Sequence, residues 1–76
     1  MNTAKFLELV RDELELDSDL HVSTNLKELD EWDSMAAMVL IGLVSNEFDV
    51  NLTGDDINSI TTVQSLIEKI GTERFE

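Results

Sequence analysis

The fold is decided by residues 33–48, DSMAAMVLIGLVSNEF. Asp33 is a good helix N-cap residue, and Gly42 is the only helix breaker between it and Phe48. The helix predicted over residues 34–48 is apolar nearly all round, because Glu47 is its only charged residue. It is therefore either buried on most sides or keeps part of its apolar surface for a partner.

The residues before this helix predict one further helix and a long connection. From Thr3 to Leu16 the apolar residues follow the spacing of an amphipathic helix. Residues 17–32 lose that spacing, and we expect a long loop that scattered leucines tie to the core. A loop of this length in a compact domain is usually functional unless it contains a helical turn.

The residues after it predict two more helices. Thr53 followed by Asp56 indicates a capped short helix over residues 54–59. Thr61 followed by Gln64 fits a capping box for a last helix that runs through Ile70. The sequence therefore predicts an all-α fold: a small four-helix bundle of three main helices and one short one, with a long loop between the first two.

Composition excludes several functions. The 76 residues carry 17 Asp and Glu against 5 Lys and Arg, a net charge of -12, so contact with nucleic acid or an anionic membrane is disfavoured. The length suits a single domain over residues 1–76 with one small core. We expect a cytoplasmic monomer, since no segment resembles a signal peptide or a membrane span. The only histidine, His21, lies in a polar stretch as an exposed loop residue, and too few polar groups converge for an enzyme.

The junction of Asp33 and Ser34 is the most informative position for function. A serine there lies at the first turn of the apolar helix, where unpaired backbone N–H groups and the helix dipole favour an anionic group such as a phosphate. These residues alone indicate a plausible attachment point. A serine at a helix start is most often only a cap.

Three blocks together resemble the acyl carrier protein family: Asp33-Ser34-Met35, Asn46-Glu47-Phe48-Asp49 and Ile60-Thr61-Thr62-Val63-Gln64. The resemblance implies that Ser34 receives a 4′-phosphopantetheine arm from coenzyme A through a separate, Mg²⁺-dependent phosphopantetheinyl transferase. It also implies that Asp33 contacts the metal and the transferase during this transfer. Ser34 has no adjacent base, so another protein must activate it. The arm's thiol then holds an acyl group as a thioester for acyl-loading and acyl-transferring enzymes.

The resemblance also suggests residues that contact the arm or a partner: Trp32, Met35, Met38, Val39, Gly42, Glu47, Ile60 and Thr61. Met35 stands where the family usually has leucine, and Trp32 where it usually has a small residue. By resemblance Met38 and Gly42 lie near the arm or the mouth of an acyl-binding groove. Two of these residues have a purely structural alternative, Met38 in the core and Trp32 over its open end. A glycine within a helix further suggests close approach by another element or by the arm.

The second helix departs from carriers of primary fatty-acid synthesis, whose exposed face bears several acids. We expect Ala36, Val39, Leu43 and Asn46 on that face here, with Glu47 as its lone acid. Recognition through this helix should then be more apolar and less sensitive to salt. The acyl group then serves fatty-acid, polyketide-like, aminoacyl or polysaccharide-related biosynthesis, and the departure favours a specialised free-standing carrier over one of primary fatty-acid synthesis.

Two other functions compete with the carrier. One is a binding module of the same fold that docks through the apolar second helix without a prosthetic group. The other is an acidic decoy that mimics nucleic acid, which leaves the Asp33-Ser34 junction unexplained. A cluster of Glu28, Asp30, Glu31 and Asp33 could also gather a divalent cation, but no ordered calcium-loop motif is present and we predict no metal site.

Overall fold

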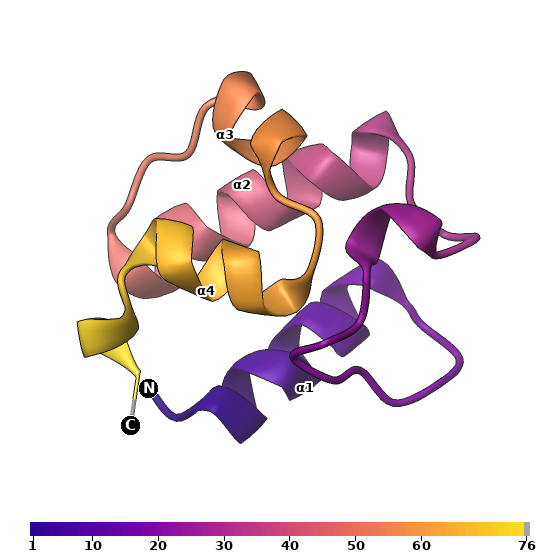
Figure 1. The fold of residues 1–76 in the computed structure, drawn as a ribbon, viewed down its shortest axis with the longest axis horizontal. Helices are drawn as coiled ribbons and strands as arrows, with labels where there is room; N and C mark the ends of the chain where they lie inside the picture. The colour runs from indigo at the N-terminus through magenta and orange to yellow at the C-terminus, as the bar shows by residue number, and fades with distance from the viewer. Residues whose placement is uncertain (76) are drawn as a thin grey trace.

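The computed structural model describes residues 1–75 and is built from helices. These are α1 (Thr3–Leu14), α2 (Ser34–Phe48), α3 (Gly54–Ser59) and α4 (Val63–Ile70), with 3-10 turns η1 (Leu26–Glu28) and η2 (Thr72–Arg74). The predicted all-α bundle of three main helices and one short one is confirmed. In Figure 1, α3 stands at one end of the molecule and α1 at the other, with α2 and α4 between them.

The first helix is shorter than predicted. It ends at Leu14 because Glu15 adopts a left-handed backbone conformation, with a φ of 55°. The N–H of Glu15 then donates to the carbonyl of Asp12, and the N–H of Leu16 donates to the carbonyl of Arg11. Leu16 lies outside the helix but is still buried. The apolar spacing therefore identified a core residue and misplaced the helix end by two residues.

The last helix begins one position later than predicted, at a different capping box. Thr62 is the N-cap, since its hydroxyl accepts the N–H of Ser65 and its own N–H donates to the Ser65 hydroxyl. The predicted Thr61 and Gln64 pair is wrong. Thr61 lies outside the helix, and its carbonyl accepts the N–H of Leu26 at 2.7 Å.

The connection between α1 and α2 is long, as predicted, but it is not structureless. It contains the turn η1, and its backbone pairs with the start of α4 through the N–H groups of Val63 and Gln64. Leu20 and Leu26 are buried in the core. The connection is thus held in place by scattered leucines, as expected. Because it contains a helical turn, its length alone does not indicate a function.

The core lies among α1, α2 and α4. Phe6 of α1 packs edge-on against Phe48 of α2, with ring centroids 5.7 Å apart, and against Phe75 near the end of the chain, at 5.2 Å. The chain ends meet nearby, where the Met1 amino group donates to the carbonyl of Arg74 at 3.2 Å (Figure 1). Within residues 1–75, no helix has the length and apolar character needed to cross a membrane.

Candidate functional site

Ser34 is the first residue of α2, and Asp33 is its N-cap. The Oδ1 atom of Asp33 accepts the N–H of Ala36 at 2.8 Å, and its carbonyl accepts the N–H of Ala37 at 3.1 Å. The Asp33 carboxylate therefore begins the helix by satisfying a backbone donor that would otherwise have no partner.

The Ser34 side chain is exposed, and none of the hydrogen bonds within residues 1–75 involves its hydroxyl. The N–H groups of Ser34 and Met35 belong to the first helical turn, where no earlier carbonyl can accept them. The first turn thus presents a hydroxyl, backbone donors and the positive end of the dipole of a 15-residue helix. This arrangement fits a phosphate ester on the serine oxygen and leaves the hydroxyl open to a transferring enzyme.

A groove of about 460 Å³ between α2 and α3 opens beside Ser34. The lining residues are mostly apolar, and Asp33 is the only one with a charge: Trp32, Asp33, Ser34, Ala37, Met38, Ile41, Gly54, Ile57 and Asn58. Trp32 is half-buried and packs against the core, as the structural alternative for it required. The groove can hold an apolar chain attached near Ser34, and an anionic cargo would find no cationic partner among these residues.

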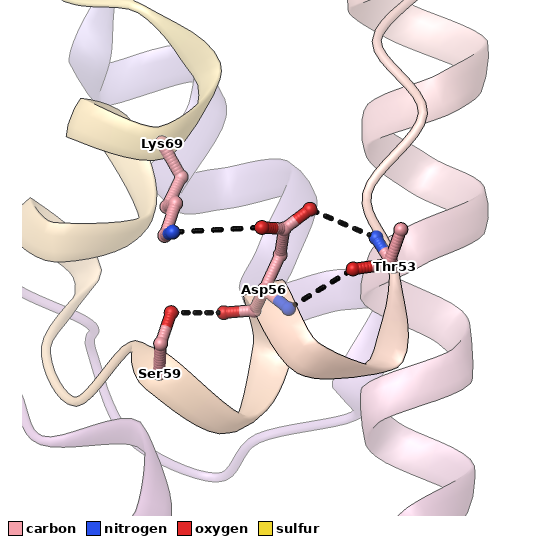
Figure 2. Close-up of polar contacts among 4 residues, drawn as sticks. All are labelled: Thr53, Asp56, Ser59 and Lys69. Carbon is pink, nitrogen blue, oxygen red and sulfur yellow. Dashed lines mark hydrogen bonds and ion pairs between the residues drawn. The ribbon is translucent and has the colours of Figure 1, made fainter.

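The far wall of this groove is α3, which polar contacts hold in place (Figure 2). The Asp56 carboxylate accepts the Thr53 N–H at 3.0 Å and faces the Lys69 ammonium of α4 at 3.5 Å. The Thr53 hydroxyl accepts the Asp56 N–H at 3.2 Å, which completes a capping box. The backbone hydrogen bond from Thr53, followed by smaller contributions from its side chain and from Lys69, lowers the pKa of Asp56.

A lysine from the long connection also contacts α3. The Lys27 ammonium of η1 donates to the carbonyl of Asn58, near the C-terminal end of α3. Ile57 is buried between these polar contacts and the core. Contacts from two other elements, η1 and α4, therefore position the wall of the groove. Sequence reasoning missed Gly54, Ile57 and Asn58 as lining residues, because no motif marks which face of a six-residue helix turns toward α2.

The face of α2 that is turned to solvent differs from the face predicted to be exposed. Ala36 and Leu43 are buried, at 6% and 9% exposure, so their predicted position on the exposed face is wrong. Leu40, Val44 and Phe48 turn into the core and fix the rotation of the helix. Asn46 and Glu47 are exposed, as predicted, and the other exposed residues of α2 are Ser34, Met35, Met38 and Gly42.

Two of these exposed residues, Met38 and Gly42, correct structural expectations from the sequence. Met38 is 71% exposed, so its structural alternative as a core residue is wrong, and Met35 is 72% exposed. A Cβ at Gly42 would meet no atom within 4 Å. The expected close approach of another element to Gly42 is therefore also wrong, because this face of α2 is turned to solvent.

The other predicted contact residues lie away from the groove beside Ser34. Ile60 is buried in the core after α3, and the exposed Thr61 forms part of the backbone pairing with η1. Glu47 lies at the opposite end of α2, about 20 Å from Ser34 along the helix axis. Val39 lines a different groove, on the α1 side of α2. The structure brings together Trp32, Asp33, Ser34 and Met38.

The acidic residues before α2 form no metal centre. Among residues 1–75, no group of three or more His, Asp or Glu side chains is placed to hold a metal ion. The described residues therefore give no support to a cation site formed by Glu28, Asp30, Glu31 and Asp33. The single histidine, His21, is an exposed loop residue, as predicted.

Fold and site define a class of protein: a small helical carrier, with an exposed serine at a helix start beside an apolar groove. Comparison with known families agrees, because the model of the phosphopantetheine attachment site matches residues 4–70. The chain belongs to this family, whose members carry covalently attached 4′-phosphopantetheine and interact with partner enzymes and phosphopantetheinyl transferases. Neither the curated proteins nor the solved structures contain a significant match.

Proposed function

We propose that this protein carries its 4′-phosphopantetheine on Ser34 and presents acyl groups to partner enzymes without catalysing a reaction itself. The observation that carries this proposal is the exposed, unbonded Ser34 hydroxyl at the first turn of α2, next to an apolar groove. Ser18 and Ser23 are also exposed, but they lie in the connection away from any helix start.

Attachment requires an outside base and an outside source of the arm. The Ser34 oxygen attacks the phosphorus that bears the pantetheine in coenzyme A, and the oxygen–phosphorus bond of the ester forms. The pyrophosphate bond breaks, and adenosine 3′,5′-bisphosphate leaves with the electron pair. The hydroxyl proton passes to a base on the transferase, since no side chain among the described residues is hydrogen-bonded to the Ser34 hydroxyl. Once bound, the arm supplies a thiol that holds an acyl group as a thioester.

The chain's own residues then determine what the arm can carry. The groove between α2 and α3 is nearly uncharged, with a carboxylate as its one charge, and favours an apolar acyl chain over an anionic one. Because α2 carries no acid except Glu47, we propose a specialised carrier in a polyketide-like, aminoacyl or polysaccharide pathway rather than in primary fatty-acid synthesis. We also propose a single-domain cytoplasmic monomer, since two copies at a net charge of -12 each repel.

The attachment is tested by mass. The protein is incubated with coenzyme A, Mg²⁺ and a phosphopantetheinyl transferase of broad specificity, and its intact mass is measured. We expect the gain of one phosphopantetheine in the wild type and in Ser23→Ala, a matched exposed serine, and no gain in Ser34→Ala. A mass gain that persists in Ser34→Ala would show that the arm is attached to another residue. No gain with several transferases would favour the binding module without a prosthetic group.

A further inference from the structure

The sulfur atoms of the chain lie in two environments. The 76 residues contain three methionines and no cysteine. Met1 is half-buried and packs against the core, whereas Met35 and Met38 are 72% and 71% exposed. Among residues 1–75, these two are the large hydrophobic side chains that remain exposed. Two of the three thioethers are therefore open to solvent, and the third is partly covered.

Both exposed thioethers lie beside the proposed attachment residue. Met35 follows Ser34, and Met38 is its neighbour on the helix surface, because residues three apart on a helix lie next to each other. Met38 lines the groove toward α3, and Met35 lines a second groove, of about 310 Å³, on the α1 side of α2. Four carboxylates belong to that second groove: Glu13, Glu15, Glu31 and Asp33. The surface around Ser34 thus has one thioether toward each groove.

An exposed methionine thioether reacts with hydrogen peroxide. The sulfur lone pair attacks one peroxide oxygen, the oxygen–oxygen bond breaks, and the proton of the transferred oxygen passes to the leaving hydroxide to give water. The sulfur is oxidised by two electrons, and the peroxide is reduced by two. The product, methionine sulfoxide, is polar where the thioether was apolar. Hydrogen peroxide is uncharged at neutral pH, so the carboxylates near Met35 do not repel it.

We propose that Met35 and Met38 form a peroxide-sensitive modification site, whose oxidation slows the transfer of phosphopantetheine to Ser34. An enzyme that reaches the Ser34 hydroxyl covers the exposed side chains next to it. A thioether is covered at little cost, whereas a sulfoxide loses its hydrogen bonds to water unless the enzyme replaces them. The slower transfer rests on the proposed function. The site of oxidation does not, because it follows from exposure.

Oxidation at these two positions leaves the core intact. The residues of α2 that turn into the core are Leu40, Val44 and Phe48, not the exposed methionines. In the free protein the sulfoxide oxygens of Met35 and Met38 are hydrated. We therefore expect the same midpoint of urea denaturation before and after oxidation. A lower midpoint for the oxidised protein would mean that oxidation acts through the fold, and would overturn the proposal.

The site is located by mass. The full chain without its prosthetic arm is treated with hydrogen peroxide for increasing times, and catalase removes the excess. The masses of peptide fragments then show which residues have gained oxygen, without competition from a cysteine or from the thiol of the arm. We expect Met35 and Met38 to be oxidised at least about threefold faster than Met1. Equal rates at all three methionines would overturn the selective site.

The effect on loading is measured as a ratio of rates. Oxidised and untreated chains are incubated with coenzyme A, Mg²⁺ and the same transferase, and initial rates are compared by intact mass. We expect the oxidised wild type to load about three- to tenfold more slowly. In Met35→Leu/Met38→Leu, treated and untreated protein should load at equal rates, because this variant has no sulfur at the site. Slowing that persists in this variant would overturn the proposal.

Two further measurements separate the sulfoxide from other peroxide damage. Met35→Gln and Met38→Gln place a polar group at each position without an oxidant, and each should slow loading. Methionine sulfoxide reductases with a dithiol should restore the rate of the oxidised wild type, because the sulfoxide oxygen leaves as water while the dithiol becomes a disulfide. A rate that stays low after both sulfoxides have been reduced would contradict the proposal.

The outcomes distinguish this inference from the proposed function. If no transferase loads the untreated chain, the proposed function fails and the slowing fails with it, while the fragment masses still decide the site of oxidation. If the untreated chain is loaded normally and the oxidised wild type is loaded equally fast, the proposed function stands and only the effect of oxidation is refuted.

Discussion

Asp33 combines a structural role with a proposed functional one. Its Oδ1 atom caps α2 through the Ala36 N–H, and its carboxylate lies next to the proposed attachment residue. The two roles make different demands. Capping needs an oxygen acceptor, which an amide also supplies, whereas an interaction with a metal or a cationic transferase needs the negative charge.

Substitutions at Asp33 should therefore separate stability from loading. Asp33→Ala removes the cap and should lower the free energy of unfolding by about 1 kcal/mol, measured by urea denaturation. Asp33→Asn should keep most of that stability but slow the transfer of phosphopantetheine to Ser34, measured by mass at early times. A loading rate that follows stability in both variants would leave Asp33 with a structural role only.

At the scale of elements, α3 depends on its contacts more than on its length. A helix of six residues is too short to be stable alone. The capping box, the buried Ile57 and the contacts from Lys27 of η1 and Lys69 of α4 hold α3 in place. Because α3 forms one wall of the groove beside Ser34, these contacts also maintain the groove.

The capping carboxylate makes the stability of α3 depend on pH. The pKa of Asp56 lies below its ordinary value of 3.8, chiefly because its carboxylate accepts the Thr53 N–H. A lowered pKa stabilises the folded state above the ordinary value, and this contribution is lost as the pH falls through the folded-state value. We therefore expect Asp56→Asn to be less stable than the wild type near neutral pH. The difference should shrink once the pH falls below the ordinary value of 3.8.

Urea denaturation across this pH range measures the difference. Asp55→Asn is the control, since it removes a carboxylate from the same first turn but not the one that bonds to Thr53. A destabilisation by Asp56→Asn that stays constant as the pH falls would mean that the charge of Asp56 does not stabilise α3.

At the scale of the whole molecule, repulsion among like charges opposes the compact folded state. The net charge of -12 belongs to a chain with a radius of gyration of 11.1 Å, so many carboxylates lie close together. Residues 1–75 contain two ion pairs between side chains, Arg11–Asp19 and Lys69–Asp56, which are too few and too exposed to offset this repulsion.

Added salt should therefore stabilise the protein. We expect the Tm to rise as sodium chloride is added at neutral pH, because screening weakens the repulsion among carboxylates more than it weakens the exposed ion pairs. Near the isoelectric point of about 4.1 the same addition should have a much smaller effect. A Tm that falls with salt at neutral pH would show that specific ion pairs outweigh the general repulsion.

Local signals predicted the elements well. Three local signals were confirmed, and each acts through neighbouring residues: the N-cap Asp33, the capping pair Thr53 and Asp56, and the long apolar run of α2. The errors lay at helix ends. Pairing of Thr61 with the distant Leu26 delayed the start of α4, whereas a local left-handed turn at Glu15, which the apolar spacing does not reveal, ended α1 early.

The sequence by itself determined the helical class, the order of the helices and the position of a serine at the start of the most apolar one, because capping and hydrophobic spacing are local. Only the tertiary structure decided which side of α2 faces solvent, since the rotation of that helix depends on how Leu40, Val44 and Phe48 pack against other elements. It also placed the acidic end of α1 beside the first turn of α2. The two grooves on either side of Ser34, one nearly uncharged and one rimmed by acids, follow from that packing.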